Sequence, residues 1–289
     1  MSAQPYDRTR EDLGNIIALE HVNLSHDNQQ HAILFYLVGL GLTRDPFIMV
    51  GLDNMWVNAG RSQFHLPTRG KQVLRGRIGL VIPDPEALLK RLDRVAKPLA
   101  GTQFKFAQGP NYVDATCPWG NRFRVHPPGP EFGPITLGLP YVEFDVPRGA
   151  APGIVRFYRQ LLEVPATVVT RDGEPVAAIT VGRVQHLYYR ETDAQIPPYD
   201  GHHMQVYVAD FSGPHERLRE RGLVFEESDQ YQYRFKDIVD LDTGKVLFTI
   251  EHEMRSVTHP LYGRELINRN PAQTNIAYVR NADRYAGTF

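Results

Sequence analysis

Two adjacent histidines, His202 and His203, stand at the start of an alternating apolar run in the segment YDGHHMQVYVAD. Because imidazole nitrogens bind divalent metals or move protons, the pair marks either a functional site or merely the start of a strand. Further along, the segment FTIEHE places Glu251 and Glu253 on one face of a strand by its period of two, with His252 on the other face. Imidazole and carboxylate groups of this kind can hold a metal ion together.

Composition limits the classes of protein to which these residues can belong. The chain has 289 residues, 42% of them hydrophobic and 22% charged, and a formal net charge of −1. This charge gives no reason to expect nucleic acid or an anionic membrane as a partner, and no apolar run has the length of a membrane span. The only cysteine, Cys117, excludes an internal disulfide and a cysteine-rich zinc site. Together with an N-terminal segment without an apolar core, these features predict a cytoplasmic protein.

The elements that position the candidate residues repeat along the chain. His21 and Glu143 are 122 positions apart, and so are the pairs Phe35 and Phe157, Tyr36 and Tyr158, and the segments GRSQ and GRVQ that begin at Gly60 and Gly182. The strand in RIGLVIPD and the strand in HMQVYVAD each run into an aspartate, Asp84 or Asp210, that can cap the following helix. Four matches in the same order indicate a tandem duplication.

Each copy contains the order strand, helix and strands twice, which predicts an α+β fold of tandem βαβββ modules. The segment His126–Pro140 is too rich in proline and glycine for a helix or a central strand. It therefore divides an N-terminal module, residues 15–130, from a C-terminal module, residues 136–256. Residues 257–289 form a C-terminal extension.

This plan resembles the vicinal oxygen chelate superfamily, which includes glyoxalase I, bleomycin-binding and fosfomycin-resistance proteins, and type I extradiol dioxygenases. The resemblance covers about residues 15–256, and the presence of two complete modules is most similar to the extradiol dioxygenases. In those enzymes the C-terminal module keeps its metal and the N-terminal module has lost it. The resemblance therefore implies curved mixed sheets around a cup-shaped site, one divalent metal ion, Fe, Mn, Zn or Mg, and a small-molecule substrate.

Carried over to this chain, the resemblance assigns the metal ligands Glu143, His203 and Glu251, with Glu253 as the alternative third ligand. The corresponding N-terminal positions are His21, Arg77 and Arg124. Because guanidinium groups have no lone pair to donate, these positions predict that the N-terminal copy holds no metal. His26, His31 and His65 then belong to the module without ligands, and His202 points away from the site.

Four further residues complete the candidate site. His186 and Tyr188 share one strand face in VQHLYYR, and the resemblance to extradiol enzymes makes them candidates for proton transfer; a hydrogen-bonded core histidine is the alternative for His186. Tyr262 and Arg264, in the loop HPLYGRELINRNP, could lie over the cup and bind an anionic substrate, or could form a dimer-stabilising arm of a homodimer.

Three functional classes follow from this interpretation. A metal-dependent lyase or isomerase of the glyoxalase type is favoured, because Glu143 stands where a ring-cleaving dioxygenase has a histidine and Leu241 where it has a tyrosine. An Fe²⁺-dependent extradiol dioxygenase is the second class. The third is a non-catalytic binding protein of the resistance type, which would leave Glu143 and His203 without a role.

Overall fold

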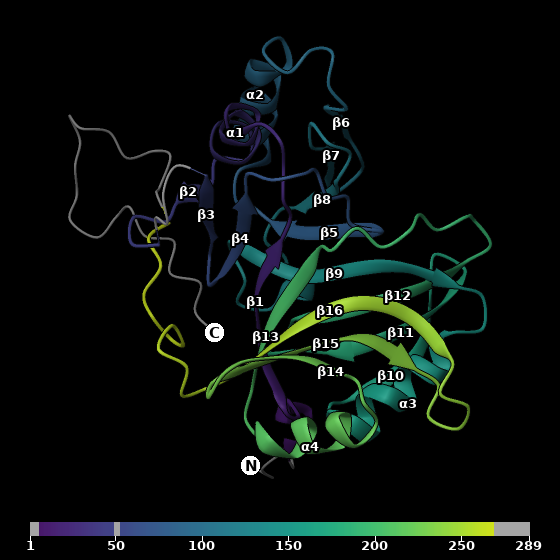
Figure 1. Ribbon diagram of the computed structural model, residues 1–289. Coiled ribbons are helices and arrows are strands. Elements are labelled where there is room, and N and C mark those ends of the chain that lie inside the picture. Colours follow the sequence, from purple (N-terminus) through teal and green to yellow (C-terminus); the bar gives the residue numbers. More distant parts are fainter. Residues whose placement is uncertain (1–5, 49–52, 269–289) are drawn as a thin grey trace, which may run out of the picture.

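The computed structural model describes residues 6–48 and 53–268 (Figure 1). Four βαβββ repeats follow one another along the chain, as the sequence predicts. The first two repeats consist of β1 (Ile16–Asn23), α1 (Gln29–Ala32) continuing into the π-helix η2 (Ile33–Gly39), β2 (Thr43–Arg44), β3 (Asn54–Ala59) and β4 (Ser62–Pro67), then β5 (Gly76–Val81), α2 (Pro85–Ala96), β6 (Lys105–Gln108), β7 (Val113–Thr116) and β8 (Arg122–His126).

The last two repeats follow a linker, and two 3₁₀ turns of the described residues lie outside the repeat plan. They consist of β9 (Gly138–Pro147), α3 (Ala151–Leu161), β10 (Ala166–Arg171), β11 (Glu174–Thr180) and β12 (His186–Thr192), then β13 (His203–Val208), α4 (Ser212–Glu220), β14 (Val224–Asp229), β15 (Gln232–Val239) and β16 (Val246–Ser256). The 3₁₀ turns are η1 (Arg8–Glu11), before β1, and η3 (Pro130–Phe132), within the linker.

Local sequence signals explain where the helices begin. Asp84 caps α2 by accepting a hydrogen bond from the backbone N–H of Ala87 at 2.9 Å, and Pro85 follows at the first helical position. Asp210 likewise accepts a hydrogen bond from the backbone N–H of Gly213 at 3.1 Å, in the first turn of α4. In the described parts of the chain, no helix has the length and apolar character needed to cross a lipid bilayer.

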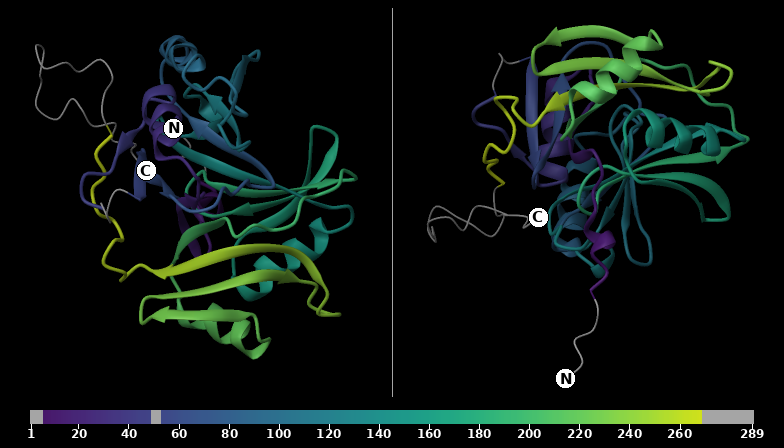
Figure 2. Two further views of the ribbon diagram at one scale, coloured as in Figure 1. Left: turned by 45° about the horizontal axis from the view of Figure 1, so that its top comes forward. Right: turned by 90° about the horizontal axis from the view of Figure 1, so that it is seen from below.

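The strands form two mixed sheets of eight, and each sheet takes half of its strands from each half of the chain. The first sheet has the order β14-β15-β16-β13-β1-β4-β3-β2, and the second has the order β10-β11-β12-β9-β5-β8-β7-β6. The first repeat is thus joined to the fourth, by the antiparallel pair β1 and β13, and the second repeat to the third, by β5 and β9. Figures 1 and 2 show β1, in purple, beside the green β13.

Equivalent glycines fix the contact between the halves. Gly60, in the turn between β3 and β4, has φ +65°, and a Cβ there would lie 1.9 Å from the carbonyl oxygen of Leu137. A Cβ at Gly182, 122 positions later, would likewise lie 3.0 Å from the carbonyl oxygen of Ile17. Each turn therefore approaches the chain at the first strand of the other half, where only glycine fits without displacing the backbone.

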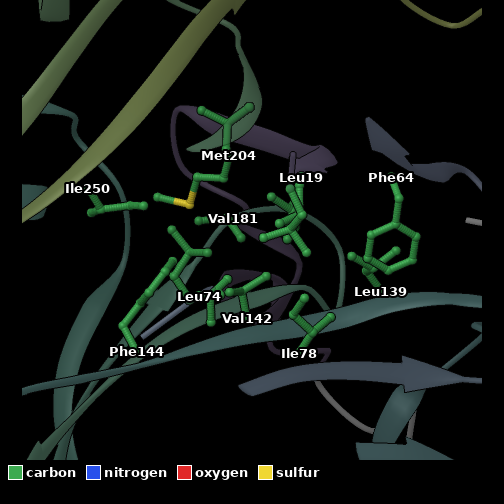
Figure 3. Packing of buried hydrophobic residues seen from close by; sticks show 14 of the residues in the cluster. Leu19, Phe64, Leu74, Ile78, Leu139, Val142, Phe144, Val181, Met204 and Ile250 are labelled. Carbon is green, nitrogen blue, oxygen red and sulfur yellow. The ribbon is translucent and has the colours of Figure 1, made fainter. Parts of the chain in front are cut away.

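The core lies between the two sheets and under the helices. Because side chains alternate across a strand, Met204 and Ile250 turn inward from the first sheet and meet Phe144 of the second (Figure 3). His203 and Gln205, which flank Met204 in β13, therefore lie on the opposite face of the first sheet. This polar face carries the candidate site.

Candidate metal centre

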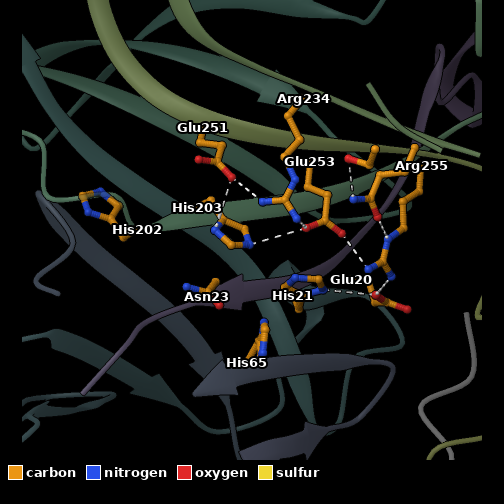
Figure 4. Close-up of polar contacts among 12 residues, drawn as sticks. Glu20, His21, Asn23, His65, His202, His203, Arg234, Glu251, Glu253 and Arg255 are labelled. Atoms are coloured by element: carbon orange, nitrogen blue, oxygen red, sulfur yellow. Dashed lines mark hydrogen bonds and ion pairs between the residues drawn. The ribbon is translucent and has the colours of Figure 1, made fainter. Parts of the chain in front are cut away.

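Three histidines from three adjacent strands converge on the polar face of the first sheet. His21 is on β1, His65 on β4 and His203 on β13, and one ring nitrogen of each lies within 4.8 Å of the others (Figure 4). The strand register explains this proximity, because Asn23 pairs with His65 on one side and with His203 on the other. The cluster thus depends on the pairing of the first repeat with the fourth.

A bulge in β1 orients His21. The register shifts between Leu19 and His21, so the extra residue, Glu20, reaches the same region as its neighbour. Its Oε2 lies 3.2 Å from Nδ1 of His21, which must donate because a carboxylate only accepts. The lone pair of His21 is therefore on Nε2, a fully buried atom with no hydrogen-bond partner among the described residues.

His65 is oriented by its neighbours on β3. Its Nε2 lies 2.5 Å from Oδ1 of Asn54, an acceptor, so Nε2 carries the proton and Nδ1 carries the lone pair. The ring also stacks on Trp56, with centroids 4.0 Å apart and planes at 12°. This stacking restricts the ring to one plane, facing the other two histidines.

Two carboxylates from β16 lie on either side of His203. Nδ1 of His203 is 3.5 Å from Oε1 of Glu251, and Nε2 is 3.5 Å from Oε2 of Glu253. Glu253 is buried at 2% exposure, whereas the Glu251 side chain is 16% exposed. Arg234, on β15, bridges both carboxylates through its two terminal nitrogens, and Arg255 pairs with Glu253 at 2.6 Å.

The protonation states suit a metal site. Burial lowers the pKa of His21, and the hydrogen bond to Glu20 opposes this only in part. Burial, with the charges of His21 and His203, lowers the pKa of His65 to about 2. For Glu253 burial acts to raise the pKa, but the nearby His203, His21, Arg255 and Arg234 outweigh it, so its pKa lies well below the ordinary value.

These residues fit a divalent metal ion. A ligand histidine must be neutral and a ligand carboxylate must be ionised, which is the state in which the fold holds His21, His65 and Glu253. The buried Nε2 atoms of His21 and His203 have no hydrogen-bond partner within the described ranges, although a buried polar atom is costly when left unpaired. A metal ion would satisfy both nitrogens, and the bond from Glu20 to His21 is the carboxylate support that metal-binding histidines commonly have.

A cavity of about 670 Å³ lies beside Glu20, and its lining among the described residues includes none of the three clustered histidines. Glu20 lines it, together with Tyr207, whose hydroxyl donates to Oε1 of Glu20 at 3.1 Å. Tyr262 and Arg264 line the same cavity, and the Tyr262 ring lies 4.8 Å from that of Tyr207. Arg264 is paired with the buried Asp45 at 2.7 Å, so it also ties the C-terminal segment to the first sheet.

The structure brings together only part of the ligand set suggested by the sequence. His203 and Glu251 are close, but Glu143 is on β9, in the second sheet, where its Oε1 lies 2.9 Å from Nη2 of Arg77. The grouping of Glu143 with His203 is therefore corrected, because the fourth repeat pairs with the first repeat and not with the third. Likewise, the N-terminal half is not without candidate ligands, since it supplies His21 and His65.

His186 and Tyr188 lie with Glu143 in the second sheet. β12 pairs with β9 so that His186 is beside Tyr141 and Tyr188 beside Glu143. His186 and Tyr188 are therefore in a different sheet from His203. His202 is completely buried and its Nδ1 bonds Oδ1 of Asp200 at 2.6 Å; Figure 4 shows it apart from the cluster.

The missed residues left a weak signal in the sequence. The internal repeat aligns His21 with Glu143, each on the first strand of its half; His21 lies opposite Gln205 of β13, and Glu143 lies opposite Arg77 of β5. The 122-residue offset does not indicate which of the four βαβββ units share a sheet. That pairing decides whether His21 or Glu143 lies near His203.

Solved structures show the same architecture. No family model and no curated protein sequence matches the chain. Glyoxalase I from Zea mays superposes with a TM-score of 0.58 at 12% identity, covering 87% of this chain and 95% of that one. A putative dioxygenase from Bacillus subtilis superposes with a TM-score of 0.54, also at 12% identity, covering 84% and 86% of the two chains.

The chain has the vicinal oxygen chelate fold. Two eight-stranded mixed sheets built from tandem modules are the form of that fold in this protein. At 12% identity the likeness concerns the fold, so the chemistry of this protein follows from its own side chains.

Proposed function

We propose that the protein is a divalent-metal-dependent enzyme acting on a small molecule with two adjacent oxygen atoms, of the lyase or isomerase type. The observation that carries this proposal is the convergence of His21, His65 and His203 within 4.8 Å beside a buried carboxylate. A non-catalytic binding protein would not need buried imidazole nitrogens that lack a hydrogen-bond partner in the described part of the chain.

The proposed ligands are His21, His65, His203 and Glu253. Three imidazoles with one carboxylate suit Fe²⁺ or Zn²⁺ better than Mg²⁺, which prefers oxygen ligands. When bound, such an ion supplies Lewis acidity that polarises a carbonyl group and stabilises an enolate. Glu20 keeps the Nε2 lone pair of His21 directed at the cluster, as Asn54 does for the Nδ1 lone pair of His65.

Glu251 is the proposed proton-transfer residue. It is the more exposed of the two β16 carboxylates, and its Oε1 lies 3.5 Å from Nδ1 of His203, so a substrate at the cluster would be within its reach. Arg234 holds this carboxylate in place through an ion pair with its Oε1. A substrate that extends past Glu20 would reach the cavity of about 670 Å³, where Tyr207 and Tyr262 form part of the wall.

Ring cleavage by an Fe²⁺ dioxygenase is the second candidate. The cluster contains a two-histidine, one-carboxylate subset in His21, His203 and Glu253, which is the ligand type of non-haem Fe²⁺ oxygenases. The sequence argument that counted Glu143 against this chemistry no longer applies, because Glu143 is in the other sheet. The missing tyrosine still counts against it.

Two assays on protein loaded separately with Fe²⁺, Mn²⁺ and Zn²⁺ distinguish these functions. The first follows exchange of the α-proton of small α-hydroxyketones with D₂O by NMR, and the second follows oxygen uptake with simple catechols under air. We expect exchange that is lost in Glu251→Gln while metal content is kept, with Glu191→Gln, a buried glutamate of the second sheet, as the matched control. Oxygen uptake that depends on His203, without proton exchange, would favour the dioxygenase instead.

A further inference from the structure

The second sheet has a polar face of its own, built around arginines. Glu143 is buried there at 3% exposure, with Arg77 at 2.9 Å and Arg171 and Arg190 each at 3.9 Å from its carboxylate. This face occupies the position in its sheet that the histidine cluster occupies in the first sheet. Arginine cannot bind a metal ion, because its guanidinium has no lone pair.

The cations on this face outnumber the anions. Asp145 pairs with Arg190 at 2.5 Å and with Arg122 at 2.9 Å. Glu143 and Asp145 together are thus surrounded by four guanidinium groups, those of the following residues: Arg77, Arg122, Arg171 and Arg190. The surplus of positive charge in a partly buried region favours an additional anion.

A cavity of about 590 Å³ opens beside these arginines, within the size range of small-ligand sites. Arg171 and Arg159 line it, and so do the rings of His186 and Tyr188. One wall is apolar, formed by Pro165, Val169 and Ala178, among others. The cavity therefore combines cationic side chains with an apolar surface.

The ring of Tyr188 holds Arg171 in position at the cavity wall. Its guanidinium carbon lies 3.8 Å from the ring centroid of Tyr188, and the ring of His186 stacks parallel to that tyrosine at 5.4 Å with an interplanar angle of 4°. Nη1 of Arg171 faces Glu143 at 3.9 Å, while the Arg171 side chain as a whole is 36% exposed and lines the cavity. A guanidinium held in place at a cavity wall is suited to pair with a carboxylate.

We propose that this face is a second binding site, separate from the metal centre, for a small organic anion. Its carboxylate group pairs with Arg171 and its apolar body lies against Val169 and Ala178. His186 and Tyr188 then serve to hold Arg171 in place and to form the cavity wall. This site does not depend on the function proposed for the histidine cluster, because the two lie in different sheets.

Isothermal titration calorimetry with benzoate, and with benzamide as its neutral isostere, tests the proposal on the full chain. Benzoate should bind at least about tenfold more tightly than benzamide, the effect of one charge-assisted hydrogen bond. Arg171→Gln should weaken benzoate by about tenfold or more, and Arg148→Gln, a surface arginine paired with Glu174 and Asp193, should not.

Two further variants make the result decisive. Thr167→Glu places a negative charge on an exposed lining position, so it should weaken benzoate without disturbing the fold. His203→Ala should leave benzoate binding unchanged. Equal binding of benzoate and benzamide, or retention of binding in both Arg171→Gln and Thr167→Glu, would overturn the proposal, as would binding that is lost only in His203→Ala.

Discussion

Replacing Glu20 by glutamine should weaken metal binding although Glu20 is not a proposed ligand. Its carboxylate accepts from Nδ1 of His21 at 3.2 Å and from Tyr207 at 3.1 Å, and pairs with Arg255 at 3.3 Å. Burial acts to raise the pKa of Glu20, but the bonds and charges of these three partners lower it below the ordinary value, so the group is anionic. An amide keeps the shape but removes the charge that fixes the tautomer of His21.

The size of the effect follows from this arrangement. Loss of a carboxylate that supports a ligand histidine typically costs about 10–100-fold in metal affinity, or about 1.4–2.7 kcal/mol. We expect Glu20→Gln to fall in this range. Tyr207→Phe, which removes one neutral donor to the same carboxylate, should cost less, about 0.5–1.5 kcal/mol.

Competition with a chromophoric chelator of known affinity measures the change for Zn²⁺, and thermal unfolding checks that each variant is folded. Glu191→Gln is the matched control, since Glu191 is equally buried but accepts from the backbone N–H of Ala151 in the second sheet. An affinity of Glu20→Gln within twofold of the wild type, or an equal loss in Glu191→Gln, would refute the proposed role of Glu20.

Three further predictions concern the ligand set, the fold and acid stability. Glu253→Gln should reduce metal affinity more than Glu251→Gln, because Glu253 is the more buried and faces Nε2 of His203; the same chelator competition measures both. Gly60→Ala should lower the free energy of unfolding by about 2–5 kcal/mol, because the left-handed backbone is strained and the new Cβ clashes with Leu137. Gly101→Ala has open space around it and should cost only about 1–2 kcal/mol of backbone strain. Urea denaturation measures both values. Burial lowers the pKa of His26 to about 4, so between roughly pH 6.5 and 4 the unfolded chain binds one more proton at this residue than the folded chain. The free energy of unfolding should therefore decrease as the pH is lowered through this range. Its dependence on pH should be weaker in His26→Gln, and an unchanged dependence would contradict the prediction.

Much of the fold is readable in the sequence because the repeat leaves local marks. The offset of 122 positions matches Gly60 with Gly182, and in the structure each of these glycines lies close to the backbone at the first strand of the other half. Helix starts such as Asp84 also depend on a few neighbouring residues. Such features are fixed by local chemistry, so a single sequence contains them.

The composition of the site depends instead on pairing between distant strands. β1 and β13 are adjacent in the first sheet although about 180 residues separate them, and nothing in either strand distinguishes this partner from β9. The alternation in FTIEHE correctly places Glu251 and Glu253 on the face of His203. The contributions of His65 and of the bulge at Glu20 emerge only once the register between strands is known.

Metal stoichiometry measured by elemental analysis tests the central claim most directly, that the first and fourth repeats form the metal site. Zn²⁺-loaded and dialysed His21→Ala and His203→Ala proteins should each lose the metal, while Glu143→Gln should keep one ion per chain because Glu143 lies in the other sheet with Arg77. Metal retained in His21→Ala but lost in Glu143→Gln would contradict the account and place the site within the C-terminal half.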